Sequence, residues 1–197
     1  MAPLSLSAAV ALAFGLGGAP PCVPIVDGRA AVPVDLLLSV AMEESGLDPG
    51  AKNKNTDGSL DVGLLQINSG NFVRLGLTPE TALDPCQSMR AASRVLLDAY
   101  DDGVTDRDKL RSVLRALSRY NTGSPTRGAA YAERVLATAR TKIIPALATL
   151  LRKPADAPAG AAPSGAPAEP AARRLDPFAG AAKPARELVF NPEAPHG

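Results

Sequence analysis

Residues 32–46 read VPVDLLLSVAMEESG, and this stretch has the pattern of an amphipathic helix. Pro33 suits the first turn of a helix, because its missing N–H has no partner there. Gly46 is a typical residue to end one. The sequence therefore predicts a helix that begins at Pro33 and ends at Gly46.

The two adjacent glutamates of this helix have different surroundings. At about 100° per residue, Asp35, Ser39 and Glu43 form one polar stripe, which we expect to face solvent. Glu44 lies roughly 140° from Ser39, on the apolar side. Burial and the negative end of the helix dipole both raise the pKa of such a carboxyl, which then suits a general acid. The helix alone leaves a second reading open, in which Glu44 reaches solvent or pairs with an arginine.

A second polar pattern lies in residues 61–68, DVGLLQIN, where an apolar run embeds Gln66 and Asn68. Buried amides need hydrogen-bond partners. They also suit recognition of the N-acetyl and hydroxyl groups of a sugar. A hydrophobic strand is the alternative reading of this segment.

A third pattern is SRYNTG at residues 118–123, which places Tyr120 and Asn121 at a helix end before a glycine turn. We expect the Tyr120 hydroxyl to donate a hydrogen bond to Glu44 or to a substrate. An ordinary helix end is the alternative here.

Together these segments resemble the three motifs of the lytic transglycosylase domain, in the order of that family: ESG at residues 44–46, GLLQI at 63–67 and YNTG at 120–123. YAERV at residues 131–135 is similar to a further aromatic position of the family. The resemblance implies a mainly helical, lysozyme-like α+β fold, a helical bundle with a small β wing and a groove for peptidoglycan. It makes Glu44 the catalytic acid and assigns the lining of the groove to Ser45, Gln66, Asn68, Tyr120, Asn121 and Tyr131.

The activity that this resemblance implies is cleavage between N-acetylmuramic acid and N-acetylglucosamine with formation of an anhydro-muramic end, without a cofactor. A hydrolytic muramidase needs a water and usually a second carboxylate, for which Asp57 and Asp61 are candidates. A peptidoglycan-binding scaffold subunit without activity is the third reading. A pure binder, however, has no need for a glutamate on an apolar helix face.

Cys22 and Cys86 form an even pair without CxxC spacing, and zinc is excluded because too few ligands are present. A disulfide between them is expected in an exported chain, and two buried free thiols are the alternative. Cys22 and DPCQ at residues 84–87 resemble the subgroup that accompanies type IV secretion and conjugation machines. The resemblance implies glycan strands of peptidoglycan as one partner and components of such a machine as another.

The chain divides into three segments. Residues 1–21 contain a short apolar run followed by small residues, as in a secretory signal, which predicts export to the periplasm. A frayed N-terminal extension is the alternative. Residues 22–151 are the expected transglycosylase domain. In residues 152–197 more than half of the positions are Pro, Gly or Ala, which predicts a disordered tail that acts as a spacer or docks through residues 175–178 or 188–190.

Further helices are predicted from capping residues: a short one from residues 78–80, one from Asp84 to Gly103, one from Asp106 to near Tyr120, and a last one from Ser124 that Pro145 interrupts. NKNTDGSLD at residues 53–61 is turn-rich and predicts a small β excursion. This stretch partly matches a calcium loop. Leu64, however, stands where a bidentate glutamate is required, so we expect a polar turn without a metal.

Composition excludes several classes of function. The net charge of +1 argues against a strongly basic nucleic-acid binder, and 4% aromatic residues argue against a stacking platform for single strands. The only histidine, His196, is next to last, which excludes histidine triads and histidine-ligated metals. We expect a monomer that acts through carboxylates, hydroxyls and amides.

Overall fold

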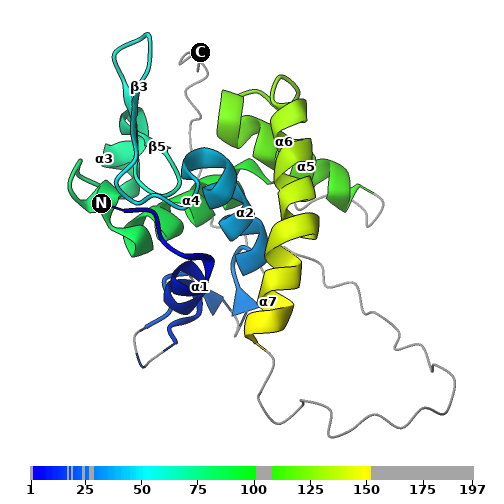
Figure 1. Ribbon diagram of the computed structural model, residues 1–197. Helices are drawn as coiled ribbons and strands as arrows, with labels where there is room; N and C mark the ends of the chain where they lie inside the picture. Colours follow the sequence, from blue (N-terminus) through cyan, green and yellow to red (C-terminus); the bar gives the residue numbers. More distant parts are fainter. Residues whose placement is uncertain are drawn as a thin grey trace, which may run out of the picture.

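A computed structural model describes residues 2–16, 18, 20–23, 25–26, 29–100 and 108–151 (Figure 1). The seven α-helices of this part are α1 (Leu6–Phe14), α2 (Val34–Ser45), α3 (Phe72–Leu75), α4 (Pro85–Ala99), α5 (Lys109–Thr122), α6 (Ala129–Thr138) and α7 (Ile144–Leu150). The strands form a two-stranded sheet, β1 (Ile25–Val26) with β2 (Arg29–Ala30), and a three-stranded one, β3 (Lys52–Lys54), β4 (Leu60–Val62) and β5 (Ile67–Asn68). The prediction of a mainly helical fold with a small β wing is confirmed.

Helix α2 lies at the centre of the helical part, between α6 on one side and α4 on the other (Figure 1). Leu37, Leu38 and Val40 are fully buried. Pro33 precedes the first helical residue, and Gly46 ends the helix in the left-handed conformation with a φ of 62°. The predicted start and end of this helix are therefore confirmed to within one residue.

The predicted solvent face of α2 is wrong. Ser39 is completely buried and donates a hydrogen bond to the Asp35 carbonyl oxygen at 2.6 Å. The Glu43 side chain is only 19% exposed, because α6 packs over it. A helical wheel shows which residues share a face, but it does not show that a second helix covers the polar one.

The β wing follows α2 directly and projects away from the helices in Figure 1. It is an antiparallel meander in the order β3-β4-β5, in which Asp61 pairs with Asn53 on one side and with Asn68 on the other. The tip is a turn in which the Gly58 N–H donates to the Asn55 carbonyl oxygen at 3.0 Å. The β excursion predicted from residues 53–61 is confirmed.

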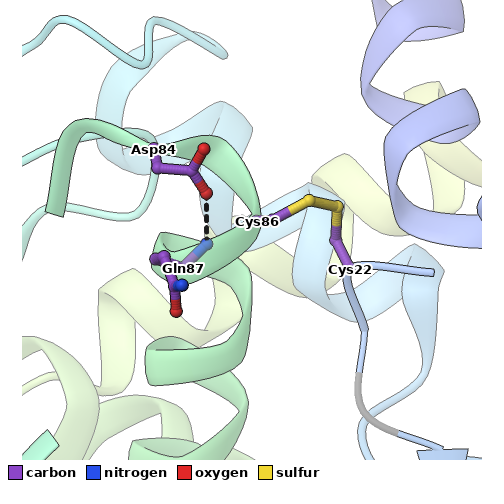
Figure 2. Close-up of a disulfide and its surroundings, with 4 residues drawn as sticks. All are labelled: Cys22, Asp84, Cys86 and Gln87. Atoms are coloured by element: carbon purple, nitrogen blue, oxygen red, sulfur yellow. Dashed lines mark hydrogen bonds between the residues drawn. A yellow bond between two sulfur atoms is a disulfide. The ribbon is translucent and has the colours of Figure 1, made fainter. Parts of the chain in front are cut away.

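Helix α4 begins where expected and ends earlier. The Asp84 carboxylate accepts a hydrogen bond from the Gln87 backbone N–H at 2.8 Å and caps the first turn (Figure 2). Cys86, in the same turn, forms a disulfide with Cys22, as Figure 2 shows. The helix ends at Ala99 and not at Gly103, since Tyr100 already has an extended backbone.

The two helices that follow α4 are described from Lys109 and from Ala129. The start predicted at Asp106 falls outside the described residues, and α5 is described from Lys109 to Thr122. Helix α6 begins at Ala129, five residues after Ser124, because residues 124–128 fold back as a turn against the end of α5. The Ser118 hydroxyl fixes this turn, accepting from the Gly128 N–H at 2.9 Å and donating to the Ser124 carbonyl oxygen at 2.7 Å.

A kink or break at Pro145 was predicted, but the helix continues there with a change of hydrogen-bond pattern. A π-helical turn, Ala139–Ile143, separates α6 from α7, and Pro145 lies in the first turn of α7. Proline has no N–H and cannot donate the hydrogen bond that this position makes in a regular continuous helix. The three pieces form one long rod along the molecule in Figure 1.

The segment predicted as a secretory signal contains helix α1. Helix α1 packs against α2, α4 and α7, with Ala9, Val10 and Ala13 buried. The tail prediction lies outside the described residues, as do both docking segments proposed for it. Among the described helices, none is both long and apolar enough to cross a membrane.

Candidate active site

A cavity of about 540 Å³ lies between the end of α2, the β wing, α4 and α5. Most of its lining is polar, and amide side chains predominate. The lining residues are Glu44, Asn53, Asn55, Asp61, Gln66, Ile67, Asn68, Asn71, Val95, Tyr120, Asn121 and Thr122. Five of the residues predicted from the motifs thus meet at one cavity: Glu44, Gln66, Asn68, Tyr120 and Asn121.

Glu44 is the acidic group at the helical wall of the cavity. Burial raises the pKa of its carboxyl from 4.5 to about 7, and the nearby charges of Asp61 and Glu43 act in the same direction. A hydrogen bond from the Tyr131 hydroxyl to Oε1, at 2.5 Å, opposes this rise. The helical wheel placed Glu44 on the apolar side of the helix, and the structure adds the hydrogen-bond partner that holds its carboxyl.

Tyr131 stands behind Glu44 and is 5% exposed. Burial and the Glu44 charge raise the pKa of its phenol above the usual range, so the hydroxyl stays a donor. The Arg134 guanidinium lies 5.8 Å from the ring centroid, and the same arginine approaches the Glu43 carboxylate at 3.5 Å. Tyr131 was expected in the groove lining, and the structure places it against the Glu44 carboxyl instead.

Tyr120 has a different partner from the expected one. Its hydroxyl donates to the Leu65 carbonyl oxygen at 2.6 Å, and burial raises the pKa of the phenol well above its usual range. The expected hydrogen bond to Glu44 comes from Tyr131 instead. Tyr120 therefore ties α5 to the turn that follows β4, and its ring forms part of the cavity wall.

Ser45 turns away from the cavity. Its hydroxyl lies 2.7 Å from the Leu64 carbonyl oxygen, to which it donates, and it accepts from the Asp48 N–H at 3.1 Å. The first bond joins the end of α2 to the turn between β4 and β5, and the second fixes the loop that follows α2. The residue assigned to the groove lining thus fixes the helix end that carries Glu44.

Gln66 has a backbone φ of 46°, which is uncommon for a residue other than glycine. Its side-chain amide nitrogen donates to the carbonyl oxygens of Gly63, at 2.9 Å, and Ala51, at 3.2 Å. One of these acceptors lies in the turn itself and the other lies just before β3. The amide oxygen is left as an acceptor on the cavity side.

Asp61 is held between two asparagines. The side-chain nitrogens of Asn55 and Asn68 donate to its two carboxylate oxygens at 3.0 and 2.9 Å. Asn68 also donates to Ser59 and accepts from the Gly70 N–H, so its amide has a full set of partners in the wing. Of the two carboxylates considered for a hydrolytic reaction, Asp61 lines the cavity, while Asp57 accepts from Ser59 at the turn.

The motif reading missed several lining residues. Three asparagines, Asn53, Asn55 and Asn71, belong to the wing and to the short helix that follows it. The turn-rich stretch was a signal for Asn53 and Asn55, but only the folded wing places them on the cavity side. No group of three or more acidic, histidine or cysteine side chains that suits a metal occurs in the described part of the chain.

Comparison with known families agrees with this geometry. The model of the transglycosylase SLT domain matches residues 25–138, which is more than half of the chain. The chain belongs to the transglycosylase SLT domain family. The matched range of this SLT domain contains every residue of the cavity lining and also Tyr131.

Relatives of this SLT domain occur in several bacteria. It is 40% identical to protein virB1 of Agrobacterium fabrum in an alignment of 136 positions, and the match covers 56% of this chain and 55% of that protein. It is 43% identical to the invasion protein IagB of Salmonella typhimurium over 68 residues, 32% of this chain and 42% of that protein. Protein IpgF of Shigella flexneri is 38% identical over 72 residues, 34% of this chain and 47% of that protein. The SLT domain chain thus spans about half the length of its virB1 relative.

Proposed function

We propose that this protein is a lytic transglycosylase that cleaves the bond between N-acetylmuramic acid and N-acetylglucosamine in peptidoglycan. The observation that carries the proposal is a carboxyl with a pKa of about 7 at the wall of a cavity lined by amides. Membership of the SLT family supports the same substrate class. A group with this pKa is protonated in a large share of the molecules at neutral pH, as a general acid must be.

The first step is proton transfer from Glu44. Because the Tyr131 hydroxyl donates to Oε1, the carboxyl proton resides on Oε2. Oε2 is the oxygen left to donate to the glycosidic oxygen. The bond between that oxygen and the anomeric carbon of the muramic residue breaks, and the leaving sugar keeps the electron pair together with the proton.

The second step closes a ring within the substrate. The positive charge at the anomeric carbon is met by the acetamide of the same sugar, so no nucleophile of the protein is required. Glu44, now ionised, takes the proton of the C6 hydroxyl, whose oxygen bonds to the anomeric carbon. The product is an anhydro-muramic end, and no water is consumed. The attacking hydroxyl is already part of the bound sugar, which removes the entropy cost of bringing in a second reactant.

Asp61 supports a second candidate, a hydrolytic muramidase. This carboxylate lines the same cavity as Glu44 and is oriented by two asparagines. In an inverting hydrolase such a group activates a water on the opposite face of the sugar. The product then has a reducing muramic end and is heavier than the anhydro form by one water.

The biological setting is part of the proposal. Likeness to protein virB1, together with the motif around Cys86, supports local opening of the cell wall for a type IV secretion or conjugation apparatus. This requires a periplasmic location, and the disulfide suits one. Components of that apparatus are the proposed partners of residues 152–197.

The first experiment is digestion of purified sacculi by the wild type and by Glu44→Gln, with mass spectrometry of the released muropeptides. Glutamine keeps the shape of the side chain but cannot donate the proton. We expect anhydro ends from the wild type and a rate at least 10²-fold lower for the variant. Asp35→Asn, on the first turn of the same helix, is the matched control and should keep the wild-type rate.

Each outcome of this experiment selects one reading. Reducing ends from the wild type would replace the lytic route by the hydrolytic one. Equal rates for wild type and Glu44→Gln would remove Glu44 from the role of acid. Absence of products from the wild type, with binding to sacculi intact, would leave a scaffold subunit.

A further inference from the structure

A second, smaller cavity of about 260 Å³ lies beside the first, between α3 and α4. Three arginines line it, Arg74, Arg90 and Arg94, and no acidic side chain does. Leu75, Leu77 and Ala91 supply an apolar part of the lining. We call this cavity the arginine groove.

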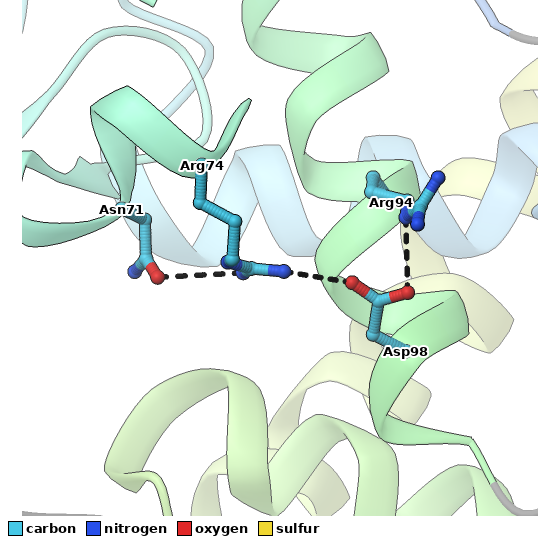
Figure 3. A network of polar contacts seen from close by, with 4 residues as sticks. All are labelled: Asn71, Arg74, Arg94 and Asp98. Atoms are coloured by element: carbon cyan, nitrogen blue, oxygen red, sulfur yellow. Dashed lines mark hydrogen bonds and ion pairs between the residues drawn. The ribbon is translucent and has the colours of Figure 1, made fainter. Parts of the chain in front are cut away.

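Two of the three arginines are held in place by one carboxylate. Arg74 Nη1 donates to Asp98 Oδ2 at 2.8 Å, and Arg94 Nε donates to Asp98 Oδ1 at 3.0 Å (Figure 3). Asp98 balances one of these two positive charges. The third arginine, Arg90, is exposed and has no polar partner within the described residues. The groove thus keeps a net charge of about two positive units, which favours an anion.

The arginine groove adjoins the cavity that contains Glu44. Asn71 lines that cavity and accepts a hydrogen bond from Arg74 Nη2 at 3.3 Å, as Figure 3 shows. On α4, Val95 lines the first cavity, while Ala91 and Arg94 line the groove. A ligand that leaves the first cavity over Asn71 therefore meets the guanidinium groups.

The charges of the two cavities are opposite. The first contains the carboxyl groups of Glu44 and Asp61, and the second contains arginines. Uncharged sugar rings suit the first. A peptide that ends in a carboxylate is repelled there and attracted to the groove. Peptidoglycan joins both parts in one molecule, because each muramic residue carries a short acidic peptide on its lactyl group.

We propose that the groove of Arg74, Arg90 and Arg94 binds a carboxylate of the peptide carried by the glycan strand in the neighbouring cavity. This inference rests on the proposed function and adds to it a substrate class, strands that still bear their peptides. Arg90 supplies the free charge, while Asp98 keeps Arg74 and Arg94 oriented. A guanidinium fits a carboxylate through two parallel N–H donors, which lysine does not offer.

The test measures binding, so that it does not depend on catalysis. All proteins carry Glu44→Gln to keep the strands intact, and the ligands are soluble glycan strands with their peptides or stripped of them by an amidase. We expect Arg90→Gln to raise the Kd for peptide-bearing strands about three- to fivefold, and to leave the Kd for stripped strands unchanged. Arg140→Gln, an exposed arginine outside both cavities, is the control and should change neither.

The results separate this inference from the proposed function. If the parent protein binds both kinds of strand equally, or Arg90→Gln weakens both equally, the groove does not recognise the peptide while the glycan cavity stands. If the parent protein binds neither, the proposed function and this inference fail together. The expected difference between the two ligands must also shrink as salt is added, because it depends on exposed charges.

Discussion

Glu43 and Glu44 are neighbours in the chain, and α6 supplies a partner for each of them. Thr138 Oγ1 donates to Glu43 Oε1 at 2.7 Å, and the Tyr131 hydroxyl donates to Glu44 Oε1. Arg134 pairs with Glu43 and lies over the Tyr131 ring. Helix α6 therefore fixes the position of the proposed acid, Glu44, and also holds the neighbouring Glu43 carboxylate.

The hydroxyl of Tyr131 is expected to set the pH range of activity. Tyr131→Phe removes a hydrogen bond that lowers the Glu44 pKa, while Asp61, Glu43 and Arg134 still act on it. The pKa then rises above about 7, and the basic limb of the pH–rate profile moves to higher pH. The rate at the optimum falls roughly tenfold, because the carboxyl loses its fixed position.

The measurement is a pH–rate profile of muropeptide release. Tyr120→Phe is the control, since its hydroxyl bonds to the Leu65 carbonyl and not to Glu44. The basic limb of the pH–rate profile of Tyr120→Phe should lie at the same pH as that of the wild type, even if its maximal rate differs. An unshifted limb in Tyr131→Phe would contradict the assigned contact.

For single residues, the sequence predicted that Glu44 lies on the apolar side of its helix. It named Tyr120 as a candidate hydrogen-bond donor to Glu44, whereas the donor is Tyr131. The orientation of Glu44 follows from the periodicity of one helix, which is local information. The partner lies 87 residues away, and the choice between Tyr120 and Tyr131 depends on how α5 and α6 pack. The same packing covers Glu43, which a wheel of α2 alone places in solvent.

Among the elements, the turn between β4 and β5 is hydrogen-bonded to three different helices. Ser45 of α2 donates to its Leu64 carbonyl, Tyr120 of α5 to its Leu65 carbonyl, and its Leu65 N–H donates to Ser88 of α4 at 3.1 Å. Three helices thus fix one short turn. This turn carries Gln66, which lines the cavity.

Gly63, at the start of this turn, has no room for a side chain. Its φ is 83°, and an added Cβ would lie 2.1 Å from the Ala82 carbonyl oxygen. Gly63→Ala must therefore move the turn or the backbone around Ala82. We expect a loss of about 2–4 kcal/mol in the free energy of unfolding, from the backbone conformation and the overlap together.

Denaturant titration of this variant should be compared with Gly58→Ala at the tip of the wing. Gly58 has a similar φ of 86° but nothing within 4 Å of the added Cβ. It should lose only about 1 kcal/mol, from the backbone conformation alone. Equal losses at the two glycines would mean that the close approach to Ala82 does not matter.

Helix ends were harder to predict than the wing. The turn-rich run at residues 53–61 encodes its hairpin locally, and so it was recognised. The start of α6 depends instead on Ser118, which holds residues 124–128 from the preceding helix. A proline after a serine looks like a helix start when that contact is not visible.

For the whole molecule, the buried Glu44 has a cost in stability. Its pKa is about 7 in the folded state and 4.5 in the unfolded one, so the folded state binds the proton more tightly. The carboxyl costs nothing below pH 4.5. Its cost grows as the pH rises to 7 and is then constant at about 3 kcal/mol.

Glu44→Gln should therefore be more stable than the wild type at pH 8, and nearly equal to it at pH 4. The measurement is denaturant unfolding of both proteins across this range, with Asp35→Asn as the control. If the difference between wild type and Glu44→Gln did not change with pH, Glu44 would titrate normally in the folded state.

Cys22 and Cys86 are 64 residues apart in the chain, so their disulfide restricts the unfolded state strongly. For a loop of this length the chain-entropy contribution is about 4 kcal/mol. It exists only where thiols are oxidised, so the chain matures to its full stability in such a compartment and stays easier to unfold and digest in a reducing one. If the protein cleaves the cell wall as proposed, it becomes resistant to proteolysis only after it has reached the oxidising compartment that contains the wall.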